Sequence, residues 1–218
     1  MLEKMSDFFA TRVEGYDNHM INNVYGCKEA YIKMAELLPK TVVDLLDLGC
    51  GTGLELDEIF KTHPDINVTG IDLTKAMLDV LKQKHPDKVM TLINASYFDT
   101  YFGIEKFDAV VSFQTLHHFS HDKKSKLYSR IYSALKPGGK YIECDYMVTE
   151  QEDENFYFQE NERIRKEQDI AADEFYHFDT PCTVNNQLMI LGKAGFEKVE
   201  MVWRIENTTI IVADKVGK

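Results

Sequence analysis

The sequence predicts an α/β fold in which a doubly wound, mostly parallel sheet carries helices on both faces. Short apolar segments alternate with helical segments between about residue 41 and residue 146. The first apolar segment, residues 42–48, runs directly into a glycine turn and then into a helical segment. Such alternation requires right-handed crossovers between parallel strands, which place helices on both faces of the sheet.

The individual elements follow in order along the chain. The first strand, residues 42–48, is nearly all apolar, as a strand buried on both faces is. Further strands are expected at residues 67–71, 89–93, 107–113 and 140–146. Thr74 and Ser120 are predicted to cap helices, and Pro64 and Pro86 follow helix ends. The helices are expected at residues 28–38, 54–62, 74–84 and 120–136.

The pattern changes after residue 146. Thr149 and Glu152 are spaced as a capping box, and the segment up to about Phe175 is helical in composition, with an apolar stripe that includes Phe156 and Ile164. This segment is too long for a plain connection between a strand and a helix, so we interpret it as an inserted lid. A helix at 183–193 and two strands at 198–205 and 208–213 follow, and the tight turn between those strands makes them antiparallel.

We therefore expect a single domain over residues 1–218. Its parts are an N-terminal helical cap (1–40), a ligand-binding core (41–146), an acidic helical lid (147–181) and a C-terminal helix with a strand hairpin (182–218).

Composition excludes several classes of protein. No segment approaches the roughly 20 apolar residues of a membrane span, and the N-terminus lacks a signal-peptide pattern, so we expect a cytoplasmic protein without a membrane partner. The four cysteines show neither disulfide nor metal-ligand spacing, and no metal is expected. The net charge of −11 opposes a nucleic-acid partner. Residues 150–179 carry eleven acidic and three basic side chains, a net of −8, which a solvated helix face explains best.

The glycine turn indicates the ligand. Gly49, Gly51 and Gly53 allow a sharp turn and close approach of a ligand to the backbone, and the next helix directs its free N–H groups to the same place. The spacing is G-x-G-x-G, with Leu54 where a dinucleotide fingerprint has its third glycine. Asp47 at the strand end favours a cationic ligand over a phosphate, because opposite charges attract. S-adenosylmethionine, which has a sulfonium, an ammonium and a ribose, fits these features.

With these residues the chain resembles the class I S-adenosylmethionine-dependent methyltransferases. The resemblance rests on four ordered segments: residues 47–53 (DLGCGTG), 70–72 (GID), 107–112 (FDAVVS) and 135–139 (LKPGG). It implies a seven-stranded sheet whose last strand is antiparallel, S-adenosylmethionine as cofactor and S-adenosylhomocysteine as product.

The resemblance also implies where the cofactor lies. Asp72 should bind both ribose hydroxyls, Leu73 and Met77 should pack on the adenine, and Tyr16 either closes over the cofactor or is a core aromatic. The adenine edge departs from the family pattern, since Asn94, Ala95 and Ser96 stand where many relatives have an acid. The expected cofactor-binding residues are Tyr16, Asp47, Gly49, Cys50, Gly51, Asp72, Leu73, Met77, Ala95, Ser96, Phe113 and Gln114.

Catalytic candidates are fewer. His118 could be a general base or could pack against the methionine end of the cofactor, as could His117. The segment 175–181 is expected to form a wall of the acceptor site, with Tyr176 or His177 reaching in, and Phe156 and Tyr157 of the lid are expected beside it.

The predicted function is methyl transfer to a small-molecule acceptor, by in-line displacement in a dry, aligned site. One alternative is an enzyme that uses a carboxylated sulfonium cofactor, which an arginine facing the sulfonium would indicate. Two others are a nicotinamide-dependent oxidoreductase and a cofactor-binding module without catalysis. The sequence leaves the acceptor and the oligomeric state open.

Overall fold

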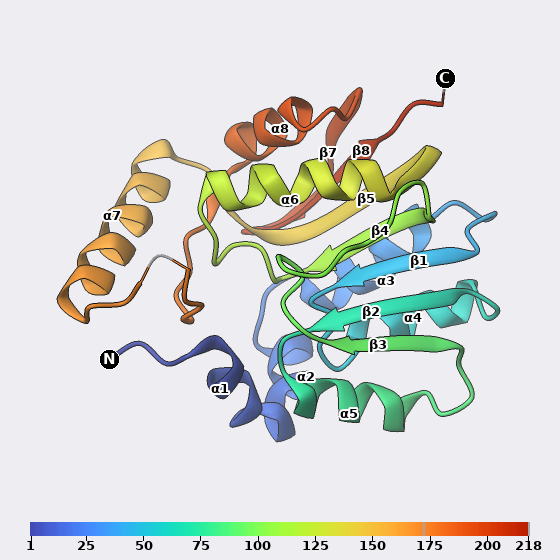
Figure 1. Cartoon of the computed structure of the whole chain (residues 1–218), viewed down its shortest axis with the longest axis horizontal. Coiled ribbons are helices and arrows are strands. Elements are labelled where there is room, and N and C mark those ends of the chain that lie inside the picture. Colours follow the sequence, from blue (N-terminus) through green and yellow to red (C-terminus); the bar gives the residue numbers. More distant parts are fainter. Residues whose placement is uncertain (172, 218) are drawn as a thin grey trace.

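The computed structural model describes residues 1–171 and 173–217, and its centre is one twisted sheet (Figure 1). The strand order is β3-β2-β1-β4-β5-β8-β7, and the two-residue strand β6 pairs with the end of β5. The first five strands are parallel, whereas β8 is antiparallel to both of its neighbours. The strands are β1 (Asp44–Leu48), β2 (Asn67–Asp72), β3 (Met90–Asn94), β4 (Phe107–Phe113), β5 (Leu135–Val148), β6 (Cys182–Thr183), β7 (Lys198–Ile205) and β8 (Thr208–Asp214).

Helices cover both faces of the sheet, which confirms the predicted fold class. Alternate side chains of β1 serve opposite layers: Leu45 packs in the core with α3 and α4, and Leu46 packs in the core with α6 and α8. The helices are α1 (Met5–Ala10), α2 (Val13–Asn22), α3 (Cys27–Leu37), α4 (Leu54–Thr62), α5 (Lys75–Lys84), α6 (His121–Ala134), α7 (Gln151–Glu167) and α8 (Val184–Lys193).

The N-terminal segment is tied to a segment that lies far away in the sequence. The Met5 N–H donates to the Phe175 carbonyl, and the His177 N–H donates to the Glu3 carbonyl, both at 3.0 Å. Lys4 and Tyr176 therefore form an antiparallel bridge. These contacts bring α1 and residues 175–177 together beside the carboxyl ends of the parallel strands (Figure 1).

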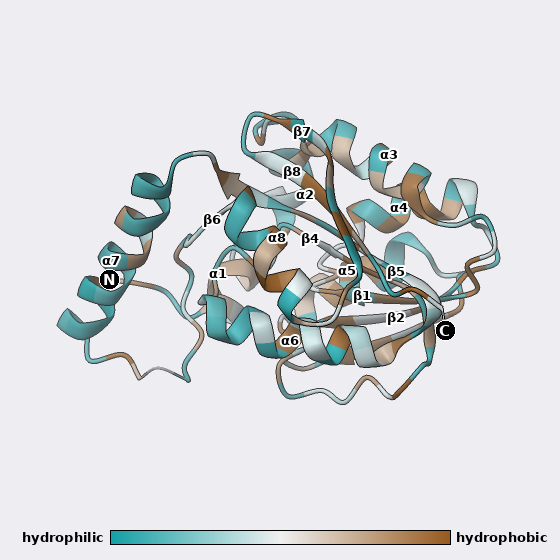
Figure 2. Ribbon diagram, turned by 90° about the horizontal axis from the view of Figure 1, so that it is seen from above, coloured by the Kyte–Doolittle hydropathy of each residue, from teal (hydrophilic) through white to brown (hydrophobic). Residues whose placement is uncertain are grey.

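The helical insertion after β5 is shorter than the sequence suggested. α7 ends at Glu167, not near Phe175, because Asp169 takes a left-handed conformation with φ 52°. The helix is polar on nearly all sides and projects away from the sheet (Figure 2). Phe156, expected in an apolar stripe, is 62% exposed. The first turns of the helix are anchored: the Glu154 carboxylate accepts hydrogen bonds from Thr183 N–H and from the Asn186 amide, and Tyr157 contacts the Tyr146 hydroxyl.

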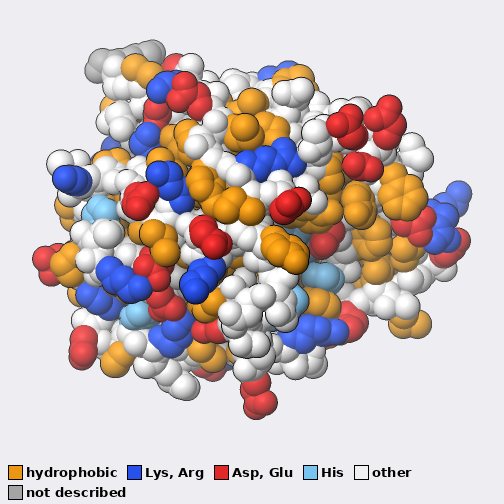
Figure 3. All heavy atoms as spheres, turned by 180° about the vertical axis from the view of Figure 1, so that it is seen from behind, with side chains coloured by type: hydrophobic (Ala, Val, Ile, Leu, Met, Phe, Trp, Pro, Cys, Tyr) orange, Lys and Arg blue, Asp and Glu red, His pale blue; other side chains and the backbone are white. Residues whose placement is uncertain are grey.

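The surface and the helices carry no sign of a membrane span. Among the described residues, no helix is both long enough and apolar enough to cross a bilayer. On the face shown in Figure 3, Lys and Arg side chains are interspersed with Asp and Glu, so that face presents no continuous basic surface.

Candidate active site

The glycine turn between β1 and α4 forms the floor of the site. Gly49, Gly51 and Gly53 all have positive φ, at 72°, 47° and 75°. A Cβ on Gly49 would lie 2.3 Å from Thr115 Oγ1, so only glycine fits there. At Gly51 the nearest side-chain atom, in the Tyr16 ring, would be 4.0 Å from an added Cβ. The turn is therefore tightly packed on one side and open beside Tyr16.

Two carboxyl groups are buried beneath this turn. Asp47 and Glu55 are 0% and 4% exposed. Among the described residues, the Asp47 oxygens have no hydrogen-bond donor other than the Glu55 carboxyl, which shares a proton with Asp47 when it is protonated. Burial, together with the charge of the neighbouring carboxylate, raises the pKa of Glu55, and burial also raises the pKa of Asp47. A buried pair of this kind is stabilised by a cationic ligand placed above it.

Asp72, at the end of β2, faces the same turn. Its Oδ2 accepts the Gly51 N–H at 2.9 Å and its Oδ1 accepts the Thr74 N–H at 2.7 Å. Each carboxylate oxygen has a second lone pair, which leaves the group able to accept hydrogen bonds from two hydroxyls. Burial raises the pKa of Asp72 to about 6 despite these two bonds.

A small cavity of about 50 Å³ lies next to Asp72. The amide of Asn94 does not face it freely, because it donates to the carbonyls of Asp72 and Leu73. The lining of this cavity includes several residues predicted to bind the cofactor, namely Gly49, Asp72, Leu73, Ala95 and Ser96.

A second cavity, of about 910 Å³, is lined by Tyr16, which lies next to Gly51, but by no residue of the glycine turn itself. α1 and α2 form one wall, and the segment 177–179 forms another. The β7–β8 turn contributes residues 206–208. The lining is largely aromatic and includes Phe9, Tyr16, Gln114, Tyr146, His177 and Asn207.

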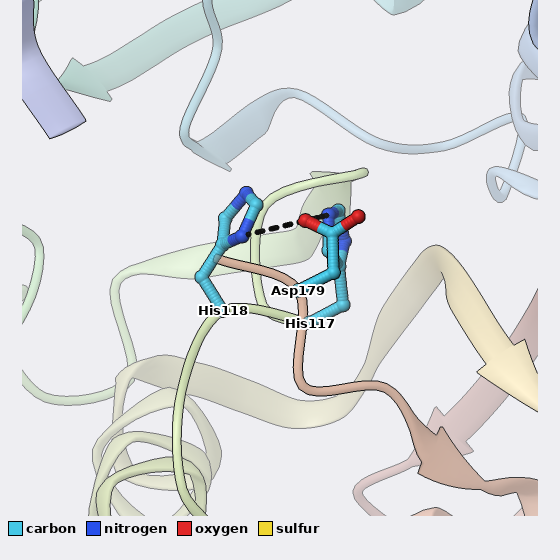
Figure 4. Close-up of side chains that lie close together, drawn as sticks. All are labelled: His117, His118 and Asp179. Atoms are coloured by element: carbon cyan, nitrogen blue, oxygen red, sulfur yellow. Dashed lines mark ion pairs between the residues drawn. The ribbon is translucent and has the colours of Figure 1, made fainter. Parts of the chain in front are cut away.

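Three histidines surround Asp179 at the inner end of this cavity, and two of them are seen in Figure 4. The Asp179 Oδ1 atom lies 3.5 Å from His117 Nε2, 3.3 Å from His118 Nδ1 and 4.0 Å from His177 Nε2. On its other side, His117 Nδ1 lies 2.5 Å from Asp145 Oδ1.

The three imidazoles differ in their environments. Burial lowers the pKa of His117, but the Asp145 and Asp179 carboxylates outweigh it and raise the pKa to about 9. Burial lowers the pKa of His118, and the adjacent His117 adds to the effect. Burial and the charge of His118 lower the pKa of His177 to about 4. His118 and His177 are therefore neutral near pH 7.

The structure distributes the predicted site residues over three places. Tyr16, Gln114, His118 and His177 line the large cavity. Asp47, Cys50, Met77 and Phe113 are buried and line neither cavity; Cys50 packs against Gly70, and Phe113 stacks on Tyr31 with ring centres 4.0 Å apart. Tyr176 also lines neither cavity, because its backbone pairs with Lys4.

Sequence reasoning missed two features of the site. Glu55 is the buried partner of Asp47. Its position two residues after Gly53, at the start of a helix, could have indicated that its carboxyl group lies near the glycine turn. Asp179 was noted only as part of a polar segment, and no local pattern predicts that it meets His117, 62 positions earlier. No residue of α7 lines the large cavity, whereas the segment after that helix does.

Comparisons with known proteins agree with this geometry. The family described as a methyltransferase domain matches residues 45–139. A carboxy-S-adenosyl-L-methionine synthase from Nautilia profundicola is 25% identical, over 98% of this chain and 96% of its own length. A phosphoethanolamine N-methyltransferase from Plasmodium falciparum is 27% identical, over 65% of this chain and 53% of its own. Residues 45–139 are therefore a methyltransferase domain, and the protein is a methyltransferase.

Solved structures support the fold of this methyltransferase. A putative O-methyltransferase from Nostoc punctiforme aligns with a TM-score of 0.73 at 19% identity, over 98% of this chain and 62% of its own. The DhpI complex with S-adenosylhomocysteine aligns with a TM-score of 0.72 at 15% identity, over 97% of this chain and 95% of its own.

The residues of the site fit S-adenosylmethionine, the cofactor that the sequence predicted. The buried carboxyls of Asp47 and Glu55 have no basic hydrogen-bond partner among the described residues and favour a cation above the turn. Asp72 retains lone pairs for the ribose hydroxyls, and the open side of the turn at Gly51 admits a ligand close to the backbone.

Proposed function

We propose that this methyltransferase transfers the methyl group to a small-molecule acceptor bound in the large cavity. The observation that carries the proposal is the cavity of about 910 Å³ beside the glycine turn, with the adenine-side residues in a separate small cavity. A volume near the upper end of the range for small-molecule sites leaves room for the methionine end of the cofactor and an acceptor together.

The chain's residues supply alignment and a dry environment. Tyr16 and Phe9 cover the cavity from α2 and α1, with ring centres 6.2 Å apart. Gln114 has positive φ, 49°, and its amide donates to Cys27 Sγ, so its side chain is held in place at the end of β4. Orientation of reactants and exclusion of water are large contributions to displacement reactions.

Proton acceptance is assigned to neutral imidazoles. His118 and His177 line the cavity, and the burial that lowers their pKa keeps them unprotonated near pH 7. Each can therefore accept a proton from an acceptor hydroxyl or ammonium. S-adenosylmethionine, when bound, supplies a methyl carbon activated by the sulfonium, whose C–S bond breaks with its electron pair left on sulfur.

A carboxylated sulfonium cofactor is the second candidate, because the carboxy-S-adenosyl-L-methionine synthase relatives align over 98% of this chain. Recognition of the added carboxylate calls for an arginine. Among the described residues, Arg12 is the only arginine that lines either cavity. Both of its terminal nitrogens bind Glu3, at 3.0 and 3.1 Å, so its fork is already occupied. We therefore favour the unmodified cofactor.

Two measurements test the proposal. Mass spectrometry of the cofactor bound to the purified protein should find S-adenosylmethionine or S-adenosylhomocysteine without an added carboxyl group. Incubation with methyl-labelled S-adenosylmethionine and a panel of amines, thiols and alcohols should transfer the label to at least one class. A bound cofactor with an extra carboxyl group, or tight NAD binding with no response to the sulfonium, would overturn the proposal.

A further inference from the structure

We propose that His117, His118 and Asp179 form a binding site for a divalent transition-metal ion such as Zn²⁺, with an open coordination position facing the large cavity. Metal binding as such does not depend on the proposed function. Only the use of the open position by a methyl acceptor rests on it.

The spacing of the donor atoms fits a metal ion. One ligand atom from each side chain lies within 4.8 Å of the other two. Asp179 Oδ1 is 3.5 Å from His117 Nε2 and 3.3 Å from His118 Nδ1. Bonds of 2.0–2.1 Å in a tetrahedral site separate neighbouring ligand atoms by about 3.4 Å. The three side chains therefore need little rearrangement to share one ion.

His117 is held in the orientation and tautomer that a metal ligand requires. Its Nδ1 lies 2.5 Å from the buried Asp145 carboxylate. A second Asp145 oxygen accepts the Leu116 N–H at 3.0 Å, which fixes the carboxylate as well. Metal binding displaces the proton from Nε2, while the proton on Nδ1 keeps the ring against Asp145, so that the Nε2 lone pair is directed to an ion shared with Asp179. Carboxylate, histidine and metal in this order are the usual arrangement of a histidine ligand and its outer-sphere partner.

Asp179 presents a buried oxygen to both imidazoles. Its Oδ1 lies 3.5 Å from His117 Nε2 and 3.3 Å from His118 Nδ1, the two nitrogens that can donate a proton to it when no metal is bound. Figure 4 shows the contacts of this carboxylate with the two imidazole rings as dashed lines. A metal ion bound by all three atoms replaces these long contacts with metal–ligand bonds.

A competing state involves His118. Its Nδ1 also lies 3.3 Å from the Phe178 carbonyl oxygen, which would accept a proton carried on Nδ1. Metal binding requires the other tautomer, with the proton on Nε2, so a metal-bound His118 cannot accept a proton and His177 is then the proton acceptor of the cavity. Metal titration distinguishes the two states, because His118 Nδ1 either donates a proton to the Phe178 carbonyl or binds the metal.

The ligand set selects the class of metal. Imidazole suits Zn²⁺, Fe²⁺, Co²⁺ and Ni²⁺, whereas Mg²⁺ and Ca²⁺ prefer oxygen ligands. Three protein ligands leave a fourth position open, as in catalytic zinc sites. All three residues line the large cavity, so a molecule there that carries a hydroxyl, thiol or amine can reach that position.

A second cluster provides an internal contrast. His121, Glu154 and Cys182 also bring their ligand atoms within 4.8 Å. However, the buried Lys124 ammonium lies 3.3 Å from Cys182 Sγ and opposes a cation there. Glu154 already accepts hydrogen bonds from Thr183 N–H and Asn186. We therefore expect no ion at this cluster.

Metal titration of the chelator-treated full chain tests the inference. Zn²⁺ and Co²⁺ should bind with one equivalent per chain, while Mg²⁺ at the same concentration should not. The Co²⁺ spectrum should show the absorption of a four-coordinate site without a thiolate charge-transfer band. His118→Ala and Asp179→Asn should each weaken binding by at least about 100-fold, more than loss of an outer-sphere partner does. H121A and C182S are matched controls that should bind as the unaltered protein does.

S-adenosylhomocysteine binding, measured on every variant, shows whether the fold is intact. Loss of metal with retained S-adenosylhomocysteine binding in H118A or D179N supports the site. No Zn²⁺ or Co²⁺ binding by a protein that still binds S-adenosylhomocysteine overturns the inference and leaves the proposed function untouched. Metal binding that H121A or C182S abolishes, or a cobalt–thiolate band, also overturns it. Metal binding at His118 and Asp179 without methyl transfer would instead contradict the proposed function alone.

Discussion

At the scale of single residues, the buried carboxyl groups beneath the glycine turn make the free protein sensitive to pH. An acid whose pKa is raised on folding binds more protons when folded, so its contribution to stability falls as pH rises from the unfolded pKa of about 4 to the folded value. For Asp72 that window ends near pH 6. Asp47 and Glu55 change in the same direction. A cationic ligand bound above the turn reduces this loss of stability, because it stabilises the ionised carboxylates.

We predict that the melting temperature of the cofactor-free protein falls between pH 5 and pH 8, and that Asp47→Asn reduces this fall. His117 also contributes to the fall, because a histidine with a raised pKa loses its contribution to stability as pH increases toward about 9. Comparison of D47N with the unaltered protein separates the contribution of Asp47 from that of His117. Thermal unfolding over this pH range is the measurement. Parallel pH profiles for D47N and the unaltered protein would show that Asp47 is not the titrating group.

Asp72 should contribute directly to cofactor affinity. Asp72→Ala removes an acceptor for the ribose hydroxyls and releases the Gly51 and Thr74 N–H groups. Loss of hydrogen bonds to a charged group costs about 1.5–3 kcal/mol, so calorimetry should find S-adenosylhomocysteine binding weaker by about 10-fold or more. Asp79→Ala, which removes an exposed partner of Lys75 on α5, is the control. Unchanged affinity in D72A would place the ribose elsewhere.

At the scale of elements, the glycine turn has little tolerance for a side chain. Gly49→Ala places a Cβ at 2.3 Å from Thr115 Oγ1 on a backbone with φ 72°. The left-handed conformation alone costs about 1–2 kcal/mol, and the clash adds to it. Denaturant unfolding should show this loss, with S-adenosylhomocysteine binding lost as well. Gly192→Ala in α8 is the matched control, since no atom lies within 4 Å of its added Cβ; it should stabilise by about 0.5–1 kcal/mol.

His177 and Asp179, not α7, form a wall of the large cavity. His177 stacks on Phe8 of α1 with ring centres 3.6 Å apart and planes 8° apart. His177→Ala should therefore lower turnover on an identified acceptor by about 10²-fold if it serves as a base, with little change in cofactor affinity. His63→Ala is the control and should not lower turnover, because His63 lines neither cavity. Full turnover in H177A would remove His177 from the mechanism.

At the scale of the whole molecule, the sequence predicted the elements that a short run of neighbouring residues identifies. The strand of residues 107–113 coincides with β4, because a continuous apolar run between turns identifies a buried strand. The end of α7 was misplaced because Ile170 and Phe175 were grouped with a helix that Asp169 terminates. Thr149 was expected to cap that helix, but its hydroxyl accepts from Arg204 and the helix begins after Glu150.

The sequence predicted that Asp47, the glycines and Asp72 lie together, and their role in cofactor binding stays a prediction; it did not predict the cluster around Asp179. Asp47, the glycines and Asp72 lie within 26 positions of one another and form a recognisable spacing. The meeting of His117, Asp145 and Asp179 depends on β5 and on the path of the chain after α7. Contacts of such long sequence separation leave no local periodicity, so only the folded chain shows them.

The N-terminal cap and the sheet are coupled at the glycine turn through Asp17. One carboxylate oxygen of Asp17 accepts the Thr52 hydroxyl at 2.5 Å, and the other lies 3.2 Å from Lys84 Nζ. These contacts place Tyr16, the preceding residue, next to Gly51. The cavity therefore depends on the docking of α2 onto the glycine turn, where we propose that the cofactor binds.

Asp17→Ala should accordingly weaken S-adenosylhomocysteine binding although we place Asp17 outside direct contact with the cofactor. Loss of one hydrogen bond to a charged group, partly compensated by water, should cost about 1 kcal/mol, or about fivefold in affinity. Asn18→Ala, whose exposed side chain binds only Asn22 among the described residues, should change affinity by less than about twofold. Limited proteolysis supplies the second readout, because a cap held by the cofactor loop should resist cleavage within residues 1–22 when S-adenosylhomocysteine is bound, and should do so less in D17A. Equal protection in D17A and N18A would mean that α2 is held by its apolar contacts alone, and that closure of the cavity is independent of the cofactor.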